Sequence, residues 1–129
     1  MTYSACFIPP IYVSSIELEL PAKIDINSAN AIATILRGAT FLEQDKSGSK
    51  VMHEVTLVPS GDIIHIDFSG TDYNKVNAFK EKFVEQAMLK SKGYVAEVYG
   101  TNKANQVEII RDDRNYNGQT HPIKRNKKI

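Results

Sequence analysis

Apolar and polar residues alternate along residues 11–20, IYVSSIELEL. Glu17 and Glu19 fall on one side of this alternation with Val13 and Ser15. The other side carries Tyr12, Ser14, Ile16, Leu18 and Leu20. Because successive side chains of a strand point to opposite faces, the pattern predicts a strand with one solvated face. The preceding Pro9-Pro10 pair indicates that residues 1–10 form an extended arm leading into the fold.

Two segments show helical rather than alternating spacing of apolar residues. The first is NSANAIATILRG at 27–38, which Asn27 or Ser28 can cap and Gly38 can end. The second follows Gly70 and can be capped by Thr71 or Asp72. Its apolar stripe is Val76, Phe79, Phe83 and Ala87. Gly93 is a typical terminating residue, so we expect this second helix to end there.

The segment between the helices reads as a β-hairpin. VMHEVTLV and IIHIDFS are joined by PSGD, and a turn at Ser60-Gly61 makes the numbers of facing residues sum to 121. Val55 then faces Ile66 and Leu57 faces Ile64 on the apolar side, where His53 is expected to be packed. The polar side collects Glu54, Thr56, His65 and Asp67.

The remaining segments complete a predicted topology. ATFLEQ at 39–44 is expected as a further strand, and YVAEVYG (94–100) and NQVEIIRD (105–112) as a second hairpin. The resulting order is β-α-(β)-β-β-α-β-β. It predicts an α+β fold with a mainly antiparallel sheet and two helices on one face, ferredoxin-like or related. We expect an arm at 1–10, one domain at 11–112 and a basic tail at 113–129.

Composition supports a single globular domain. The chain has 129 residues, of which 42% are hydrophobic and 24% charged. No apolar run approaches the roughly 18 residues needed to cross a bilayer, so we expect no membrane association. The N-terminal stretch has no basic residue before its apolar part, which argues against a secretory signal. A lone Cys6 allows no internal disulfide and favours a reducing, cytoplasmic location.

Charge is divided unevenly along the chain. Residues 1–113 carry 11 basic and 15 acidic side chains, a net charge of −4, whereas residues 114–129 carry five basic side chains and no acidic one. The body therefore has no overall field that attracts a polyanion, and such binding has to come from the tail or from a local patch.

The best catalytic candidates are Glu54, His65 and Asp67 on the polar side of the predicted hairpin. Two facing carboxylates beside an imidazole can hold a divalent metal or perform acid–base chemistry. The alternative is an ordinary solvated strand face in which His65 makes a cross-strand ion pair, and we favour it. No metal-ligand spacing and no glycine-rich phosphate loop occurs, so the sequence predicts no metal and no cofactor.

The C-terminal segment RNYNGQTHPIKRNKKI is almost devoid of large apolar residues. A basic arm of this kind neutralises phosphates without reading sequence. We therefore expect a small non-enzymatic module that contacts nucleic acid or a ribonucleoprotein through six basic residues: Lys124, Arg125, Lys127, Lys128, Arg114 and Arg111. The alternatives are an accessory subunit that uses its terminal arms for protein contacts or self-association, and an idle solubilising tail.

Overall fold

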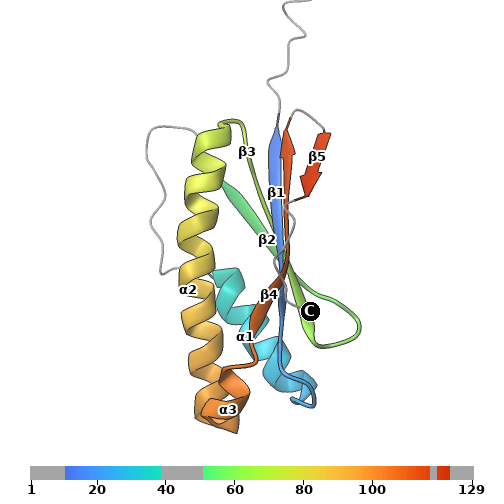
Figure 1. The fold of residues 1–129 in the computed structure, drawn as a ribbon, viewed down its shortest axis with the longest axis vertical. Coiled ribbons are helices and arrows are strands. Elements are labelled where there is room, and N and C mark those ends of the chain that lie inside the picture. Colours follow the sequence, from blue (N-terminus) through green and yellow to red (C-terminus); the bar gives the residue numbers. More distant parts are fainter. Residues whose placement is uncertain (1–10, 39–50, 117–118, 123–129) are drawn as a thin grey trace, which may run out of the picture.

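The computed structural model describes residues 11–38, 51–116 and 119–122; for 114–116 and 119–122 it describes the backbone alone (Figure 1). The described elements are β1 (Tyr12–Glu19), α1 (Ile26–Gly38), β2 (Met52–Leu57), β3 (Ile63–Gly70), α2 (Tyr73–Tyr99), α3 (Thr101–Ala104), β4 (Glu108–Tyr116) and β5 (Gln119–Pro122). The expected arm at 1–10, which includes Cys6, and the expected strand at 39–44 lie outside the described residues.

The strands form one antiparallel sheet in the order β2-β3-β1-β4-β5. The predicted hairpin is confirmed in its register, since Val55 pairs with Ile66 and Leu57 with Ile64. β1 lies between β3 and β4, so the N-terminal strand is central and joins the two halves of the sheet. A bulge between Glu17 and Leu18 shifts its register against β4.

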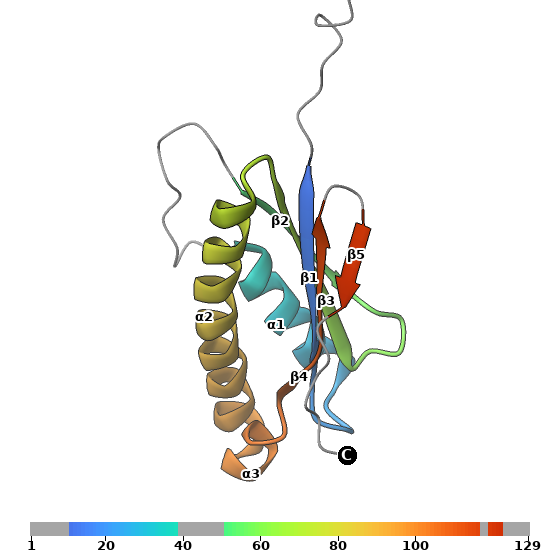
Figure 2. The ribbon, with the colours of Figure 1, turned by 45° about the horizontal axis from the view of Figure 1, so that its top comes forward.

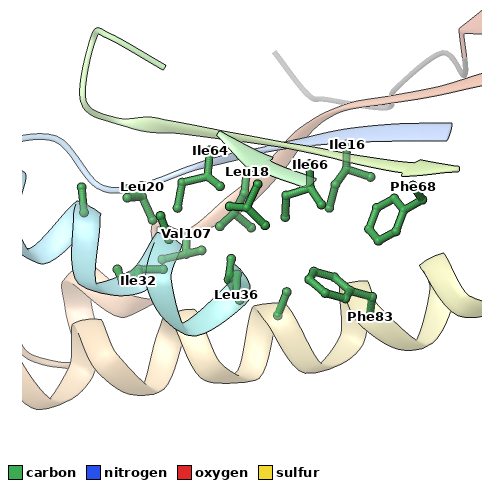
Figure 3. Close-up of a cluster of buried hydrophobic side chains, with 14 of the residues drawn as sticks. Ile16, Leu18, Leu20, Ile32, Leu36, Ile64, Ile66, Phe68, Phe83 and Val107 are labelled. Carbon is green, nitrogen blue, oxygen red and sulfur yellow. The ribbon is translucent and has the colours of Figure 1, made fainter. Parts of the chain in front are cut away.

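One face of the sheet is covered by α1 and α2, which lie on the same side in both views (Figures 1 and 2). Strand side chains such as Ile16, Ile66 and Phe68 point toward this helical layer and meet Leu36 and Phe83 (Figure 3). All five are fully buried. Burial of a large apolar side chain stabilises a fold by about 1.5–3 kcal/mol. The contacts between the sheet and these two helices therefore form the hydrophobic core. The predicted α+β class with an antiparallel sheet is confirmed.

The C-terminal half of α2 differs from the prediction. The helix does not end at Gly93 but continues to Tyr99, so the strand expected at 94–100 and the hairpin built on it are wrong. The short α3 follows, which gives three described helices instead of two. The cause is tertiary packing, which overrides the β-propensity of YVAEVYG. The side chains of α2 that this packing buries recur at helical spacing through the glycine: Val76, Lys80, Phe83, Ala87, Ser91 and Val95.

The end of the chain also contributes to the sheet. β4 continues to Tyr116 and β5 pairs with it, Asp113 lying opposite Pro122. The expected boundary at 112/113 therefore falls inside β4, and residues 119–122 form an edge strand where only tail was expected. No helix in the described ranges is long and apolar enough to cross a membrane.

Candidate functional site

The face of the sheet opposite the helices carries mostly polar side chains. The strand registers place them in rows across β2, β3, β1 and β4: Glu54, Asp67, Ser15 and Asp113 in one row, and Thr56, His65, Glu17 and Arg111 in the next. Ile63, Glu19 and Glu108 follow on β3, β1 and β4. We call this the outer sheet face. Directly paired residues share a face, so these side chains are neighbours.

His65 is the centre of a hydrogen-bonded chain on the outer sheet face. Its Nδ1 lies 3.0 Å from Glu17 Oε2 on β1, and its Nε2 lies 2.9 Å from Asp67 Oδ1 on its own strand. Ser15 Oγ donates to the same Asp67 oxygen at 2.7 Å. The expected cross-strand ion pair of His65 is therefore present, and its partner is Glu17.

Both ring nitrogens of His65 face carboxylates, and only the protonated ring donates from both. Burial by itself lowers the pKa of His65, but hydrogen bonds to Glu17 and Asp67 and the charges of both carboxylates raise it. The net result is a pKa above the ordinary histidine value. The arrangement therefore favours the protonated ring, and a carboxylate lies within hydrogen-bonding distance of each ring nitrogen.

Glu54 does not join this chain. It lies directly opposite Asp67, as the hairpin register predicts. Its side chain is exposed, and it makes no hydrogen bond or ion pair with a described residue. The structure thus brings His65 and Asp67 together but adds Glu17 in place of Glu54. Within the described residues no group of three histidine, cysteine or acidic side chains could hold a metal ion.

A second charged group lies on the opposite face of β4, toward the helices. Lys80 of α2 is 6% exposed, and its Nζ donates to Ser14 Oγ at 2.7 Å and to Asp112. Ser14 Oγ in turn donates to the backbone oxygen of Asp113 at 3.1 Å. A buried ammonium needs such partners because its desolvation is costly. This network ties α2 to β1 and β4.

The residues predicted to bind phosphates are divided by the structure. Arg111 lies on the outer sheet face, where its Nε donates to Asp113 Oδ2 at 2.6 Å, and this hydrogen bond raises its pKa. Arg114 lies in β4, opposite Ser14. Lys124, Arg125, Lys127 and Lys128 lie outside the described residues.

Glu17 and Lys80 are the charged residues at the centre of these networks that the sequence did not single out. Glu17 was placed correctly on the solvated side of its strand, but nothing local indicated that β1 pairs with β3. Lys80 falls among apolar positions of the helical stripe, and that position was the only available signal of its burial.

Comparisons with protein-family models, curated proteins and solved structures found no match to this chain.

Proposed function

We propose that this chain is a non-enzymatic binding module that contacts the phosphates of nucleic acid or a ribonucleoprotein through its basic C-terminal segment. The observation that carries the proposal is the segregation of charge: residues 114–129 have five basic side chains and no acidic one. The outer sheet face, by contrast, is rich in carboxylates. Because that face repels phosphates, attraction for a polyanion is concentrated in the segment.

The β4–β5 hairpin supports this proposal by giving the segment a fixed starting point. β5 is an edge strand and ends at Pro122. Lys124, Arg125, Lys127 and Lys128 follow within six residues. Their role is to neutralise phosphates, which positions a partner without reading its bases. Arg114 lies in the hairpin itself and has the same role. Arg111 contributes less, because Asp113 already pairs with it.

We also propose that the scaffold is a ferredoxin-like arrangement extended by an extra strand. The order β2-β3-β1-β4 supports this, because β3 lies between β1 and β2, as in a split β-α-β unit. The additional strand β5 and the short α3 are departures from the simple β-α-β-β-α-β order. A fold of this kind hosts many unrelated functions, so the scaffold by itself does not indicate one.

The test is nucleic-acid binding by the full chain and by a variant with Lys124, Arg125, Lys127 and Lys128 changed to Gln. A truncation at residue 113 is unsuitable because it would remove β5 and part of β4. A matched control changes four lysines in the folded domain to Gln: Lys23, Lys82, Lys90 and Lys92. Fluorescence anisotropy with generic single- and double-stranded DNA at about 50 and about 200 mM salt reports binding and its salt dependence.

We expect the full chain and the control to bind, and the tail variant to lose most of its affinity. Four phosphate contacts give a salt slope of at most about −3.6 on duplex DNA, which is a loss on the order of 100-fold over that salt range. If the full chain does not bind at low salt, or if the tail variant and the control lose affinity equally, the proposal is wrong.

A further inference from the structure

The outer sheet face has an uneven charge. Six carboxylates belong to it, from all four of its strands: Glu17, Glu19, Glu54, Asp67, Glu108 and Asp113. The basic side chains that the structure places there are Arg111 and, when protonated, His65. Neither α1 nor α2 covers this face, because both pack on the opposite one (Figure 2). The face therefore suits a positively charged segment.

The path of the chain brings the last described strand to the edge of this face. Pro122 at the end of β5 pairs with Asp113, which belongs to the outer sheet face. β5 runs antiparallel to β4, so at Pro122 the chain is heading toward the level of Arg111 and Glu108. Seven residues follow, with the sequence IKRNKKI. Fully extended they reach about 23 Å, whereas the three strand spacings from β4 to β2 amount to about 14 Å.

The chemistry of the segment complements the face. It carries four basic side chains and no acidic one, and the face carries a clear excess of carboxylates. One exposed ion pair changes an equilibrium constant by only roughly 1.4- to 5-fold. A tethered segment, however, meets its surface at an effective concentration in the millimolar range, so several weak pairs suffice for docking.

We infer that the outer sheet face is a docking surface for this chain's own residues 123–129, and that a polyanion binds the segment by displacing it from this face. The first half of the inference stands on the path of β5 and on charge complementarity. The second half rests on the proposed function. The outer sheet face and a polyanion therefore compete for the same segment. The carboxylates of the face bind it until phosphates, which have a higher charge density, take their place.

Docking is tested by backbone amide NMR of the full chain, compared with the variant carrying Gln at positions 124, 125, 127 and 128. We expect shift differences at outer-face residues of β1, β3 and β4, including Glu17, Asp67 and Arg111. The control variant with Gln at 23, 82, 90 and 92 should leave those signals in place. Differences confined to residues 119–129 would overturn the inference.

The identity of the occupant is tested by dilution. A segment that docks on its own domain gives shifts that do not change when the full chain is diluted about tenfold, because tethering fixes its effective concentration. Outer-face shifts that disappear on dilution would mean that the segment docks on a second copy, which would overturn the intramolecular assignment.

Displacement is tested with a triple variant of the face, Glu19→Gln, Glu54→Gln and Glu108→Gln, which keeps His65, Glu17 and Asp67 unchanged. The matched control is Glu81→Gln, Glu85→Gln and Glu97→Gln on α2, which changes the net charge equally. Competition predicts that the face variant binds generic DNA at least roughly threefold more tightly than the control variant.

The outcomes separate the two proposals. Equal affinity of the face variant and its control would overturn displacement and leave the proposed function standing. If no variant binds DNA, the proposed function and the displacement both fail, while the NMR comparison still decides whether the segment docks on the outer sheet face.

Discussion

At the scale of single residues, His65 shows how a solvated strand face acquires a defined structure. The two ring nitrogens of a histidine on a solvated strand ordinarily form hydrogen bonds with water. In this fold Glu17 lies next to Nδ1 of His65 and Asp67 lies next to Nε2. Their combined effect exceeds the lowering caused by burial, and the pKa of His65 is raised. The protonated form is therefore more favourable in the folded chain than in the unfolded one.

This gives a prediction for pH dependence. A group whose pKa is raised on folding contributes stability that is fully present below its unfolded pKa of about 6.5 and is lost as pH rises through the folded value. His65→Gln should therefore reduce the free energy of unfolding more at mildly acidic than at mildly alkaline pH. Urea unfolding of both proteins at about pH 5.5 and about pH 9 measures the difference.

The control for this experiment is Thr56→Ser, a conservative change at the residue that faces His65 across β2 and β3. It should have the same effect at both pH values. A loss of stability in His65→Gln that is equal at both pH values, or larger at the alkaline one, would show that the ring makes no favourable charged contact in the folded state.

The site was only half predictable from the sequence, for a physical reason. The sequence predicts that Glu54 faces Asp67 and that His65 lies beside them, because the two strands of this hairpin are adjacent in the chain. The partner that decides the chemistry, Glu17, lies 48 residues from His65 in sequence. Their contact depends on β1 inserting between β3 and β4, and no local pattern specifies the pairing of strands so far apart in sequence.

At the scale of elements, α2 is where local and tertiary signals disagree. Gly93 and the β-prone YVAEVYG favour a break, yet Ser91 and Val95 continue the buried stripe across it. Gly93 is on the exposed side, where its missing side chain costs the helix some stability without disturbing the packing. The extension has a purpose in the fold, because the Tyr99 hydroxyl accepts from the Asp25 N–H at 2.9 Å and donates to Ser28 Oγ at 3.1 Å.

Replacing Gly93 with Ala tests this helix directly. Nothing lies within 4 Å of an added Cβ, and alanine is the better helix former, so we expect a gain of about 0.5–1 kcal/mol in the free energy of unfolding. Gly100 is the matched control, because it ends α2 with a φ of 103° that suits glycine alone. Gly100→Ala should cost about 1–3 kcal/mol.

Denaturant unfolding of the two variants distinguishes the alternatives. A helix that stopped at Gly93 would reverse the result, since glycine would then be the terminating residue and its replacement would destabilise the protein. Stabilisation by Gly93→Ala together with destabilisation by Gly100→Ala is expected only if α2 runs through position 93 and ends at position 100.

At the scale of the whole molecule, the sheet separates two environments. Its inner face is apolar and is covered by α1 and α2, with Lys80 held by Ser14 and Asp112 as its buried cation. Its outer face is acidic, and the basic residues beyond Pro122 start from its edge. The chain as a whole is nearly neutral, but its negative charge is concentrated on the outer sheet face and its positive charge in the segment after Pro122.

This distribution leads to a prediction for salt and stability. If residues 123–129 neutralise the outer sheet face, changing Lys124, Arg125, Lys127 and Lys128 to Gln restores repulsion among its carboxylates. We expect the free energy of unfolding to fall by on the order of 1 kcal/mol at low ionic strength. The loss should shrink in about 1 M salt, where charges are screened beyond about 3 Å. Urea unfolding at both salt concentrations measures it. The control with Gln at 23, 82, 90 and 92 raises the net negative charge equally, but it removes cations of the folded domain, one between β1 and α1 and three in α2. An equal, salt-sensitive loss in the control would mean that net charge alone is responsible and that the segment has no particular place on the domain.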